Sequence, residues 1–547
     1  MRAFGSSAIA AAIAVTLTGV ARAESPYDEA QRAYVLAPLA RVLPPNEPGT
    51  LRFTATGFIN LRAQLQRSIP MPATLSAKAE IPGLVSSSIH QRAFVAPWVR
   101  FTPMFEWGSA LRFIGQVDLA QGKVLGNQAF DVGPDPQPRD NAGNIGSFVL
   151  PRWLYGELLT KVGLLRVGMQ PNHWAMGILA NDGDHAQLFG VPRLGQISER
   201  ILFATKPLGE KGPLTTALAG DLVYRDNFAR LTRGDVAFQG VLATFLEAGP
   251  HQIGFFGVYR AQKTERDSVG VPYNDDLKVF VFDLAGHTMA PLPGFTDAFA
   301  FAEAEGAMQI GTSSELRSSA RPGERATIQA FGAATRVGFV FGGNPTRWQP
   351  PARYGKLVAQ VEWGYASGDA DPNDGVQKRF TFDPNHRVGL LLFDEVLRWS
   401  SARAAAIARD PLLANASRPQ PGLEYLPTGG GVAGAQYVNP TFVYRPEPKL
   451  DIRAGIVVAQ ATSDVVSQVR ATTTGRYENE FGGNPTRRDL GVELDLGVYK
   501  RIPLSYDMEA IFGAEGGVLF PGGALADATG TTMKTPWMAV LQTGLGF

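Results

Sequence analysis

The chain has 547 residues, of which 51 are basic and 50 acidic, so its formal net charge is +1. This balance excludes a global electrostatic attraction to nucleic acid or to another polyanion. The sequence contains no cysteine, which excludes a disulfide framework, a cysteine-ligated metal and a thiol nucleophile.

The N-terminal residues have the pattern of a secretory signal peptide. Arg2 supplies a positive charge, residues 8–20 are apolar and uncharged, and residues 21–23 match a small-x-small cleavage site. The apolar run is shorter than the ~20 residues that span a bilayer as a helix. We therefore predict a signal peptide over residues 1–23, export from a bacterial cytoplasm and an N-terminal periplasmic segment over residues 24–49.

Short segments of alternating polarity follow, each bounded by Gly, Pro, Asn or Asp, which is the pattern of β-strands. We predict about 18 of them, an even number as bacterial β-barrels require. They lie near residues 50–65, 89–105, 109–121, 147–159, 162–170, 197–206, 214–225, 235–247, 251–262, 277–288, 297–310, 325–341, 354–366, 435–445, 450–461, 488–499, 504–518 and 537–547.

The connections between these segments alternate in length. Tight links such as 107–109 and 160–161 are followed by long polar stretches such as 122–146 and 171–196. Barrels of the outer membrane show this alternation, with short periplasmic turns and longer extracellular loops. We predict an all-β fold, a single transmembrane antiparallel β-barrel of about 18 strands (16–18) over residues 50–547.

The long link 171–196 contains two histidines, His173 and His185, close to Asp182 and Asp184. Two interpretations stay open: a metal site, or turns marked by the Asp-Gly and Pro-Asn pairs. Another turn sequence, Phe-Gly-Gly-Asn-Pro-Thr-Arg, occurs twice, at 341–347 and 481–487. The predicted topology places these copies on opposite sides of the membrane, and they receive no functional assignment.

The longest link, 368–434, contains a helical insert. Residues 390–409 lack Gly and Pro, and Leu392, Val396 and Trp399 recur at helical spacing, followed by Arg403 and Ile407. A loop of this length is expected to pack. It is either a lid or plug that gates the lumen, or an extracellular helix on the rim.

The same link opens with Asp369, Asp371, Asn373 and Asp374, which begin like an EF-hand calcium loop. The pattern then departs, because Asp374 stands where glycine is needed and Phe380 where the bidentate glutamate is needed. Asp369, Asp371 and Asn373 are thus a weak calcium candidate beside the alternative of a solvated acidic turn, and we predict no metal and no cofactor.

The last segment, 537–547, alternates in polarity and ends on Phe547. A terminal aromatic strand of this kind is typical of outer-membrane barrels, and we expect the assembly machinery to recognise it.

The inward faces of the predicted strands carry arginines early in the chain and acids late in the chain. Closure would set these opposite charges on facing walls of a wet channel, or pair them in a filled interior. The predicted pore-lining residues are Arg52, Arg62, Arg92, Arg100, Arg112, Arg166, Glu362, Asp489, Glu493, Asp495, Asp507, Glu509 and Glu515.

The plan of the chain resembles porin-like outer-membrane channels. It looks most like the alginate-export type, on the strand end 363–369 (Trp-Gly-Tyr-Ala-Ser-Gly-Asp) that runs into an acidic Asp-Pro-Asn-Asp loop, and on the terminal aromatic strand. That resemblance implies a passive conduit for an anionic polysaccharide with an arginine-rich lumen. The late inward acids depart from it, so only the channel architecture is carried over.

The sequence contains no Gly-x-Ser-x-Gly elbow, His-Glu-x-x-His helix or Walker lysine, and we predict no enzyme. The predicted function is passive passage of a polar solute or polysaccharide across a Gram-negative outer membrane, with outer-membrane lipid around the barrel and no nucleic-acid partner. A barrel with a structural or partner-binding role and a barrel hydrolase are the alternatives.

Overall fold

The computed structural model describes residues 46–70, 88–89, 92–121, 125–126, 149–185, 187–192, 195–268, 271–314, 325–343, 354–402, 428–468, 470–471, 475–506 and 508–547. The predicted signal peptide and most of the segment 24–49 lie outside these residues. The described residues contain no helix that is both long and apolar enough to cross a membrane.

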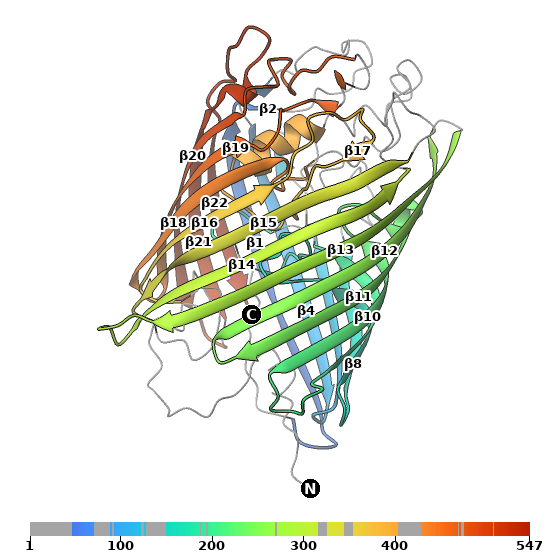
Figure 1. Ribbon diagram of the computed structural model, residues 1–547. Helices are drawn as coiled ribbons and strands as arrows, with labels where there is room; N and C mark the ends of the chain where they lie inside the picture. The colour runs from blue at the N-terminus through green and yellow to red at the C-terminus, as the bar shows by residue number, and fades with distance from the viewer. Residues whose placement is uncertain are drawn as a thin grey trace.

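Eighteen long strands in the described residues form one closed antiparallel barrel (Figure 1). They are β1 (Leu51–Arg67), β4 (Arg92–Trp107), β5 (Leu111–Leu119), β7 (Val149–Leu159), β8 (Leu164–Pro171), β9 (Ile197–Thr205), β10 (Leu214–Arg225), β11 (Asp235–Ala248), β12 (His251–Ser268), β13 (Val271–Pro291), β14 (Ala298–Ser313), β15 (Ala326–Phe341), β16 (Leu357–Ala366), β18 (Ala435–Glu447), β19 (Leu450–Ala461), β20 (Asp489–Pro503), β21 (Glu509–Pro521) and β22 (Trp537–Gly546). Each predicted strand corresponds to one of them, which confirms the predicted fold class.

The other named elements in the described residues are short. They are the strands β2 (Ile69–Pro70), β3 (Ser88–Ile89), β6 (Leu125–Gly126) and β17 (Val376–Gln377), the 3₁₀ turns η5 (Leu231–Arg233) and η9 (Gly523–Leu525), and the π-helix η7 (Leu392–Leu397). β17 adds to the sheet in parallel with β15, whereas β2 and β3 pair only with each other.

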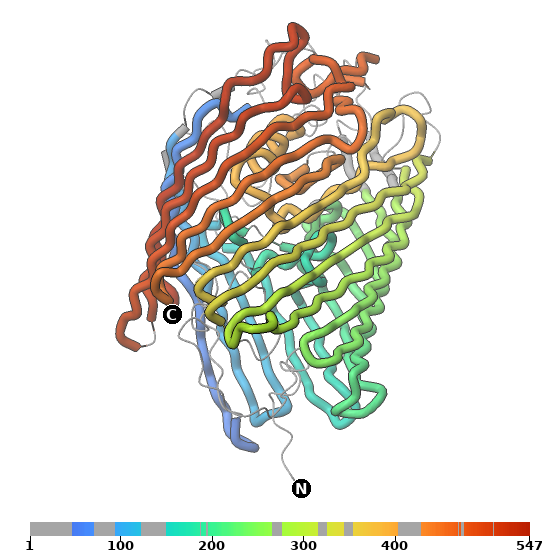
Figure 2. The backbone as a smooth tube through the Cα atoms, turned by 60° about the vertical axis from the view of Figure 1, so that its left-hand side comes forward, coloured from blue at the N-terminus to red at the C-terminus, as the bar shows by residue number. Residues whose placement is uncertain are grey.

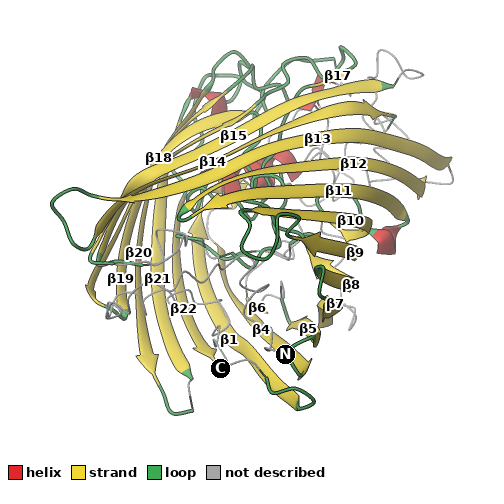
Figure 3. Cartoon of the chain, turned by 60° about the horizontal axis from the view of Figure 1, so that its bottom comes forward, coloured by secondary structure: helices red, strands yellow, loops and turns green. Residues whose placement is uncertain are grey.

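Closure of the barrel depends on β1, which pairs with β4 on one side and with β22 on the other. Seen from the end that carries the tight turns, the strands form a continuous ring (Figure 3). At the seam the Gly57 N–H donates to the Phe547 carbonyl oxygen at 2.9 Å, and the Phe547 N–H donates back at 3.1 Å. Gly57 is also a close-packing position, since a Cβ there would lie 2.8 Å from the Phe547 ring.

The side chains alternate as the sequence predicts. On β1, Leu51 and Phe53 are 66% and 54% exposed, whereas Asn60 and Gln64 are buried inside the barrel. The same alternation continues on most strands, so large apolar side chains cover the outer surface. An outer surface of this kind needs an apolar surrounding, and a closed sheet leaves no backbone edge exposed to it.

A bulge on β20 changes the phase of its outer end. The register with β19 shifts between Ala459 and Gln460, and Gly491 opposite the shift has a φ of +115°. As a result Leu490 is buried and Asp489 is exposed. The sequence pattern, which assumed an uninterrupted strand, gave the reverse assignment for these two residues.

The two ends of the barrel differ. The tight turns, the start of β1 and Phe547 lie at one end, here called the turn end, and the longer connections lie at the loop end (Figure 2). Phe341 begins the first copy of the repeated heptapeptide at the turn end, and the second copy, 481–487, lies in a connection at the loop end. Residues 344–347 of the first copy lie outside the described residues.

The seam geometry yields a test. Gly57→Ala would place a methyl group 2.2 Å from the Arg100 carbonyl oxygen and against Phe547, so we expect most of the protein to fail to close. The measurement is the heat-modifiable mobility shift of the refolded barrel on gels. Gly220→Ala on β10 is the matched control, because its Cβ meets nothing within 4 Å; equal folding of the two variants would contradict the proposed importance of the seam.

Candidate functional site: the barrel interior

Two segments fold into the barrel and pack against its inner wall. We call residues 172–192 the first inner loop and residues 378–402 the second inner loop. Residue 186 lies outside the described residues. Both begin at the loop end, the first after β8 and the second after β17. In Figure 3 the described loop residues are seen within the ring of strands.

The first inner loop reaches opposite walls. Its Asp184 carboxylate is bound by Arg100 of β4, and the Ile178 N–H donates to Glu305 Oε2 of β14 at 3.4 Å. β4 and β14 are separated by half of the ring in either direction. The Arg453 guanidinium of β19 adds a third anchor by donating to the Leu188 carbonyl oxygen at 2.7 Å.

Apolar side chains also hold this loop in place. The Trp174 ring packs 4.8 Å from Phe245 and 5.1 Å from Phe256, and its Nε1–H donates to Asp283 Oδ1 at 3.0 Å. Ile178 is fully buried. The sequence pattern marked 171–196 as a long polar link with a metal site or turns as its open interpretations, and it did not predict an inward path. The signal that it missed was the presence of Trp174, Ile178 and Phe189, which are too apolar for an exposed loop.

A buried charge cluster joins this loop to the wall. Arg100 binds Asp118 through Nε at 2.7 Å and Nη2 at 2.9 Å, and it also binds Asp184. Arg152, whose side chain is fully buried, binds Asp184 at 2.7 Å. Two guanidinium groups thus face two carboxylates, so the charges are neutralised within the cluster, as buried charges require.

The second inner loop is held by an acid of the late strands. Glu493 of β20 accepts the backbone N–H groups of Leu390, Leu391 and Leu392, at 2.5, 2.7 and 2.6 Å. These donors precede and begin the π-helix η7, where no intrahelical acceptor is present for them. The inward position of Glu493 therefore serves to anchor the helix.

The helix itself packs as its spacing predicts. Leu392, Val396 and Trp399 are all buried, and helical structure continues over residues 398–402. Glu395 accepts from Trp399 Nε1 at 2.9 Å and from Gln64 Nε2 of β1 at 3.3 Å. The predicted helix is confirmed over 392–402 and lies inside the barrel; Arg403 and Ile407 lie outside the described residues.

The two inner loops also bind each other. The Asp383 N–H donates to the Ile178 carbonyl oxygen at 2.7 Å, and Arg387 Nη1 donates to the Val191 carbonyl oxygen at 3.0 Å. Asp383 Oδ2 accepts from Gln196 at 2.9 Å and from Asn227 at 3.1 Å. Burial raises the pKa of Asp383 to about 6. One carboxyl group thus joins three connections at the loop end.

Nearer the turn end, the wall carries a row of alternating charges. Its members are Arg52, Glu106, Arg112, Glu157 and Arg166, from the consecutive strands β1, β4, β5, β7 and β8. Each is the direct cross-strand partner of the next. The ion pairs measure 2.5 Å for Arg52–Glu106, 3.0 Å for Glu106–Arg112, 3.9 Å for Arg112–Glu157 and 2.5 Å for Glu157–Arg166. We call these five residues the charged row.

The charged row presents its arginines to the interior space. The three arginine side chains are 20–27% exposed, whereas those of Glu106 and Glu157 are 4% and 10% exposed. The two glutamates were missed by the sequence analysis. Glu106 and Arg112 lie equally far from one tight turn, and Glu157 and Arg166 lie equally far from the next. This symmetry predicts that they are cross-strand partners and could have identified the two glutamates.

The other predicted pore-lining residues differ in position: some face the interior, and others lie outside the described residues. Arg62, Asp495 and Glu515 face the interior, and Glu515 accepts from the Gly190 N–H of the first inner loop at 3.1 Å. Glu509 lies 3.7 Å from Arg501. Arg92 is part of β4, but its side chain lies outside the described residues. Asp507 lies outside the described residues altogether.

Glu362 lies at the centre of a polar cluster on the wall of β15, β16 and β18. Its carboxylate is bound by Arg336 at 2.5 Å, by the Tyr437 hydroxyl at 2.5 Å and by His386 Nε2 at 2.9 Å. Because His386 belongs to the second inner loop, this cluster attaches that loop to a second wall. Glu362 thus acts as an anchor and is almost fully buried.

The expected segregation of charge does not match the described interior. Glu106, Asp118 and Glu157 lie among the arginines of the early strands. On the late strands, Arg445 and Arg453 bind Asp451 at 2.8 and 3.0 Å. Cross-strand pairing neutralises the charges at these positions, so arginines and acids are not simply segregated between the early and the late strands.

The acidic turn after β16 is hydrogen-bonded by its own backbone N–H groups and by one tyrosine of the connection between β19 and β20. Asp369 Oδ1 accepts the Asp371 N–H at 3.2 Å, and Asp371 Oδ1 accepts the Asn373 N–H at 3.0 Å and the Tyr477 hydroxyl at 2.8 Å. These contacts are those of an acidic turn. In the part of the chain that the structure describes, one group of side chains has the spacing of a metal site: His173, Asp182 and His185.

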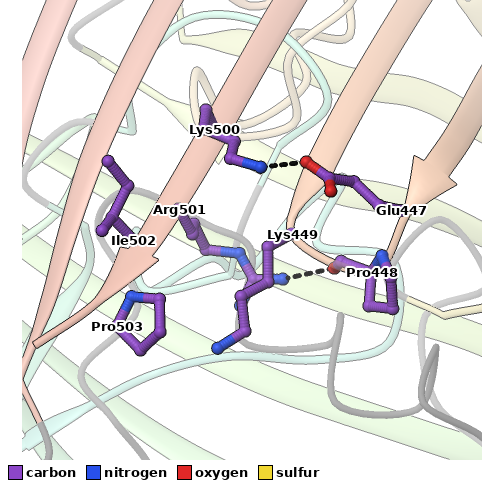
Figure 4. A pocket seen from close by; sticks show the side chains of 7 residues that line it. All are labelled: Glu447, Pro448, Lys449, Lys500, Arg501, Ile502 and Pro503. Carbon is purple, nitrogen blue, oxygen red and sulfur yellow. Dashed lines mark hydrogen bonds and ion pairs between the residues drawn. The ribbon is translucent and has the colours of Figure 1, made fainter.

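A pocket also lies at the turn end, between the β18–β19 turn and the end of β20 (Figure 4). Lys500 pairs with Glu447 across it, and Arg501 Nη2 donates to the Pro448 carbonyl oxygen at 3.0 Å. Three of its charged groups, those of Lys500, Glu447 and Arg501, bind each other or the backbone of the turn. We therefore assign the pocket to the turn structure and not to a binding site.

Fold and interior together define the class of protein as a porin-like β-barrel with inward-folded loops. No family model matches the chain, and no curated protein matches it.

Solved structures give matches at low identity. OprD, an outer membrane protein from Pseudomonas aeruginosa, is 8% identical, with 92% of this chain and 97% of that chain covered and a TM-score of 0.45. OccK9 (OpdG) from the same organism is 11% identical, with 90% and 98% covered and a TM-score of 0.47. OccAB1 from Acinetobacter baumannii is 9% identical, with 90% and 97% covered and a TM-score of 0.43.

None of the three structures has a name of the alginate-export type, so the resemblance to that type stays a prediction.

The buried charge cluster yields a second test. Asp118→Asn leaves two buried guanidinium groups with one carboxylate, and we expect a loss of about 3–5 kcal/mol in unfolding free energy. Asp276→Asn is the matched control: its partner Arg325 is 42% exposed, and the expected loss is about 0–1 kcal/mol. Urea titrations in detergent measure both; equal losses would refute the assignment of the cluster as a buried anchor.

Asp383 yields a pH test. Its pKa of about 6 in the folded protein exceeds the ordinary value of 3.8, so folding favours the neutral acid. The stabilisation is complete below pH 3.8 and is lost as the pH rises to 6, by up to about 3 kcal/mol. Asp383→Asn should remove this dependence. The difference between the urea midpoints of the two proteins, compared at pH 4 and pH 8, checks it, and a constant difference would contradict it.

Proposed function

We propose that this protein is an outer-membrane channel for the passive passage of a small polar solute, with a preference for anions. The observation that carries the proposal is the charged row. Three guanidinium groups face the interior space, and the two carboxylates that hold them lie behind, more deeply buried. A solute passing the row would meet cations first.

The chemistry of the row suits carboxylate or phosphate groups. A guanidinium group presents N–H donors in a fixed plane, a geometry that matches the oxygens of carboxylate and phosphate groups. The neighbouring carboxylates fix the positions of the arginines and reduce the net charge. Fixed donors with modest net charge favour entry of an anion without trapping it, which passive conduction requires.

The inner loops favour a small solute over a polysaccharide. The first inner loop binds opposite walls, and the second binds β1, β16 and β20. Both therefore narrow a cylinder that would otherwise be wide enough for a broad aqueous channel.

The outer-membrane location is supported by the apolar outer surface. Exposed large side chains alternate with interior residues on strands all around the barrel, including Phe105, Leu154, Phe282 and Leu496. A surface of this kind is stable next to lipid chains and unstable in water. The sequence of 537–547, which ends on Phe547, is the part that we propose the assembly machinery binds.

Ion selectivity in planar bilayers tests the proposal. We expect single-channel currents from the purified protein and a reversal potential that shows anion preference in a KCl gradient. The triple variant with Arg52→Gln, Arg112→Gln and Arg166→Gln should shift the reversal potential toward cation preference, because the glutamates lose their counter-charges. Arg476→Gln is the control, since that side chain is 70% exposed and remote from the row.

Absence of current from the folded protein would favour a structural or partner-binding barrel instead. An unchanged reversal potential in the triple variant would remove the charged row from the permeation path. The mobility shift on gels shows whether each variant is folded before either conclusion is drawn.

Removal of residues 385–425 tests the role of the second inner loop. The Phe382 N–H donates to the Val432 carbonyl oxygen at 2.8 Å, so the two ends of this segment are held together without it. We expect the shortened barrel to fold and to carry a larger single-channel current. A current equal to that of the full chain would show that the loop does not restrict the path.

A further inference from the structure

Three side chains of the first inner loop meet outside the charge clusters described above. Asp182 Oδ1 lies 2.9 Å from His185 Nδ1 and 3.8 Å from His173 Nδ1. One ligand atom from each residue lies within 4.8 Å of the others. The two imidazole rings are stacked, with centroids 3.4 Å apart and an angle of 11° between their planes.

These separations are close to those of ligands around one metal ion. A zinc-class ion holds nitrogen and oxygen ligands at about 2.1 Å, so two ligands at the tetrahedral angle are about 3.4 Å apart. The two observed nitrogen–oxygen distances lie on either side of this value. The nearly parallel stacking of the two rings means that one imidazole has to rotate before both ring planes contain the ion. The hydrogen bond between His185 Nδ1 and Asp182 Oδ1 would be exchanged for bonds to the ion, with release of a proton.

The hydrogen bonding of His173 prepares it to be a ligand. Its Nε2 lies 3.1 Å from the Ala175 carbonyl oxygen, which can only accept, so Nε2 carries the proton. In the neutral ring Nδ1 then has a lone pair, and this atom faces Asp182. Histidine ligands in metal sites are commonly oriented by this kind of bond from the other ring nitrogen to a backbone carbonyl group.

The backbone around Asp182 is fixed by the barrel wall. The fully buried Arg152 donates through Nη2 to the Asp182 carbonyl oxygen at 2.5 Å. Gly195 packs so closely against Asp182 that a Cβ there would lie 1.9 Å from its carbonyl carbon. The Gly183 N–H donates to Asn181 Oδ1 at 3.0 Å. The ligand positions are thus held in place before any ion arrives, which lowers the cost of binding.

We propose that His173, Asp182 and His185 form a binding site for a divalent transition-metal ion of the zinc class. Two imidazole nitrogens and one carboxylate oxygen suit such an ion better than Ca²⁺ or Mg²⁺, which prefer oxygen ligands. Three protein ligands leave a coordination position open. The His185 side chain is 43% exposed, so the cluster is accessible from solvent.

Binding to the full-length barrel in detergent tests the proposal. The probe is ZnCl₂, added at pH 7.5 in competition with a chromogenic chelator, with CaCl₂ as the comparison ion. We expect one equivalent of Zn²⁺ to bind to the wild type and not to be displaced by Ca²⁺. His173→Gln and His185→Gln should each weaken binding by about tenfold or more. His251→Gln on β12 is the matched control and should bind as the wild type does.

No Zn²⁺ binding by the wild type, or equal binding by His185→Gln and His251→Gln, would overturn the proposal. His185→Gln keeps the test secure if His173→Gln does not fold, because His185 is the most exposed of the three residues. The readout is metal binding and not current. A barrel that binds Zn²⁺ without conducting would refute the channel and leave the metal site intact.

Discussion

The pairing of β1 with β22 is the constraint on which the rest of this molecule depends. A sheet in a membrane cannot leave an edge open, because unpaired N–H and C=O groups in lipid cost several kcal/mol each. Here the last pair of the seam is formed by Gly57 and Phe547. The position next to the Phe547 ring has to be a glycine, because a Cβ there would clash with the ring. Once the seam has formed, the sheet has an inner and an outer face. Successive side chains along each strand then alternate between the interior and the outer surface.

Charged side chains in the closed interior still need oppositely charged or hydrogen-bonding partners. The barrel does this by direct cross-strand pairing in the charged row, by the buried cluster around Arg100, and by giving Glu493 three backbone donors. The same contacts hold the inner loops. Interior acids and arginines therefore have two roles, since the groups that fix the loops also determine which charges remain facing the space between them.

The sequence predicted the strands, the closure and the helix over 392–402 because these depend on local periodicity and on the residue types of turns. It did not predict the inward path of the first inner loop, since that path depends on contacts such as Trp174 with Asp283, which are remote in the chain. The assignment of Asp489 failed for a different reason: one bulge at Gly491 inverts the alternation, and no local pattern marks it. The pairs of the charged row that flank a tight turn can be predicted from their symmetric positions about that turn. The contacts of Glu493 with residues 390–392 cannot, because those residues are remote in the chain.

The attachment of the first inner loop to β4 and β14 has a mechanical consequence. A hollow cylinder made of one sheet flattens easily, since bending between neighbouring strands costs little. A strut fixed at both ends across the diameter resists that flattening. In the proposed membrane location, lateral pressure would then be carried partly by Arg100, Asp184 and Glu305, and the cross-section would stay nearly constant as the bilayer changes in tension.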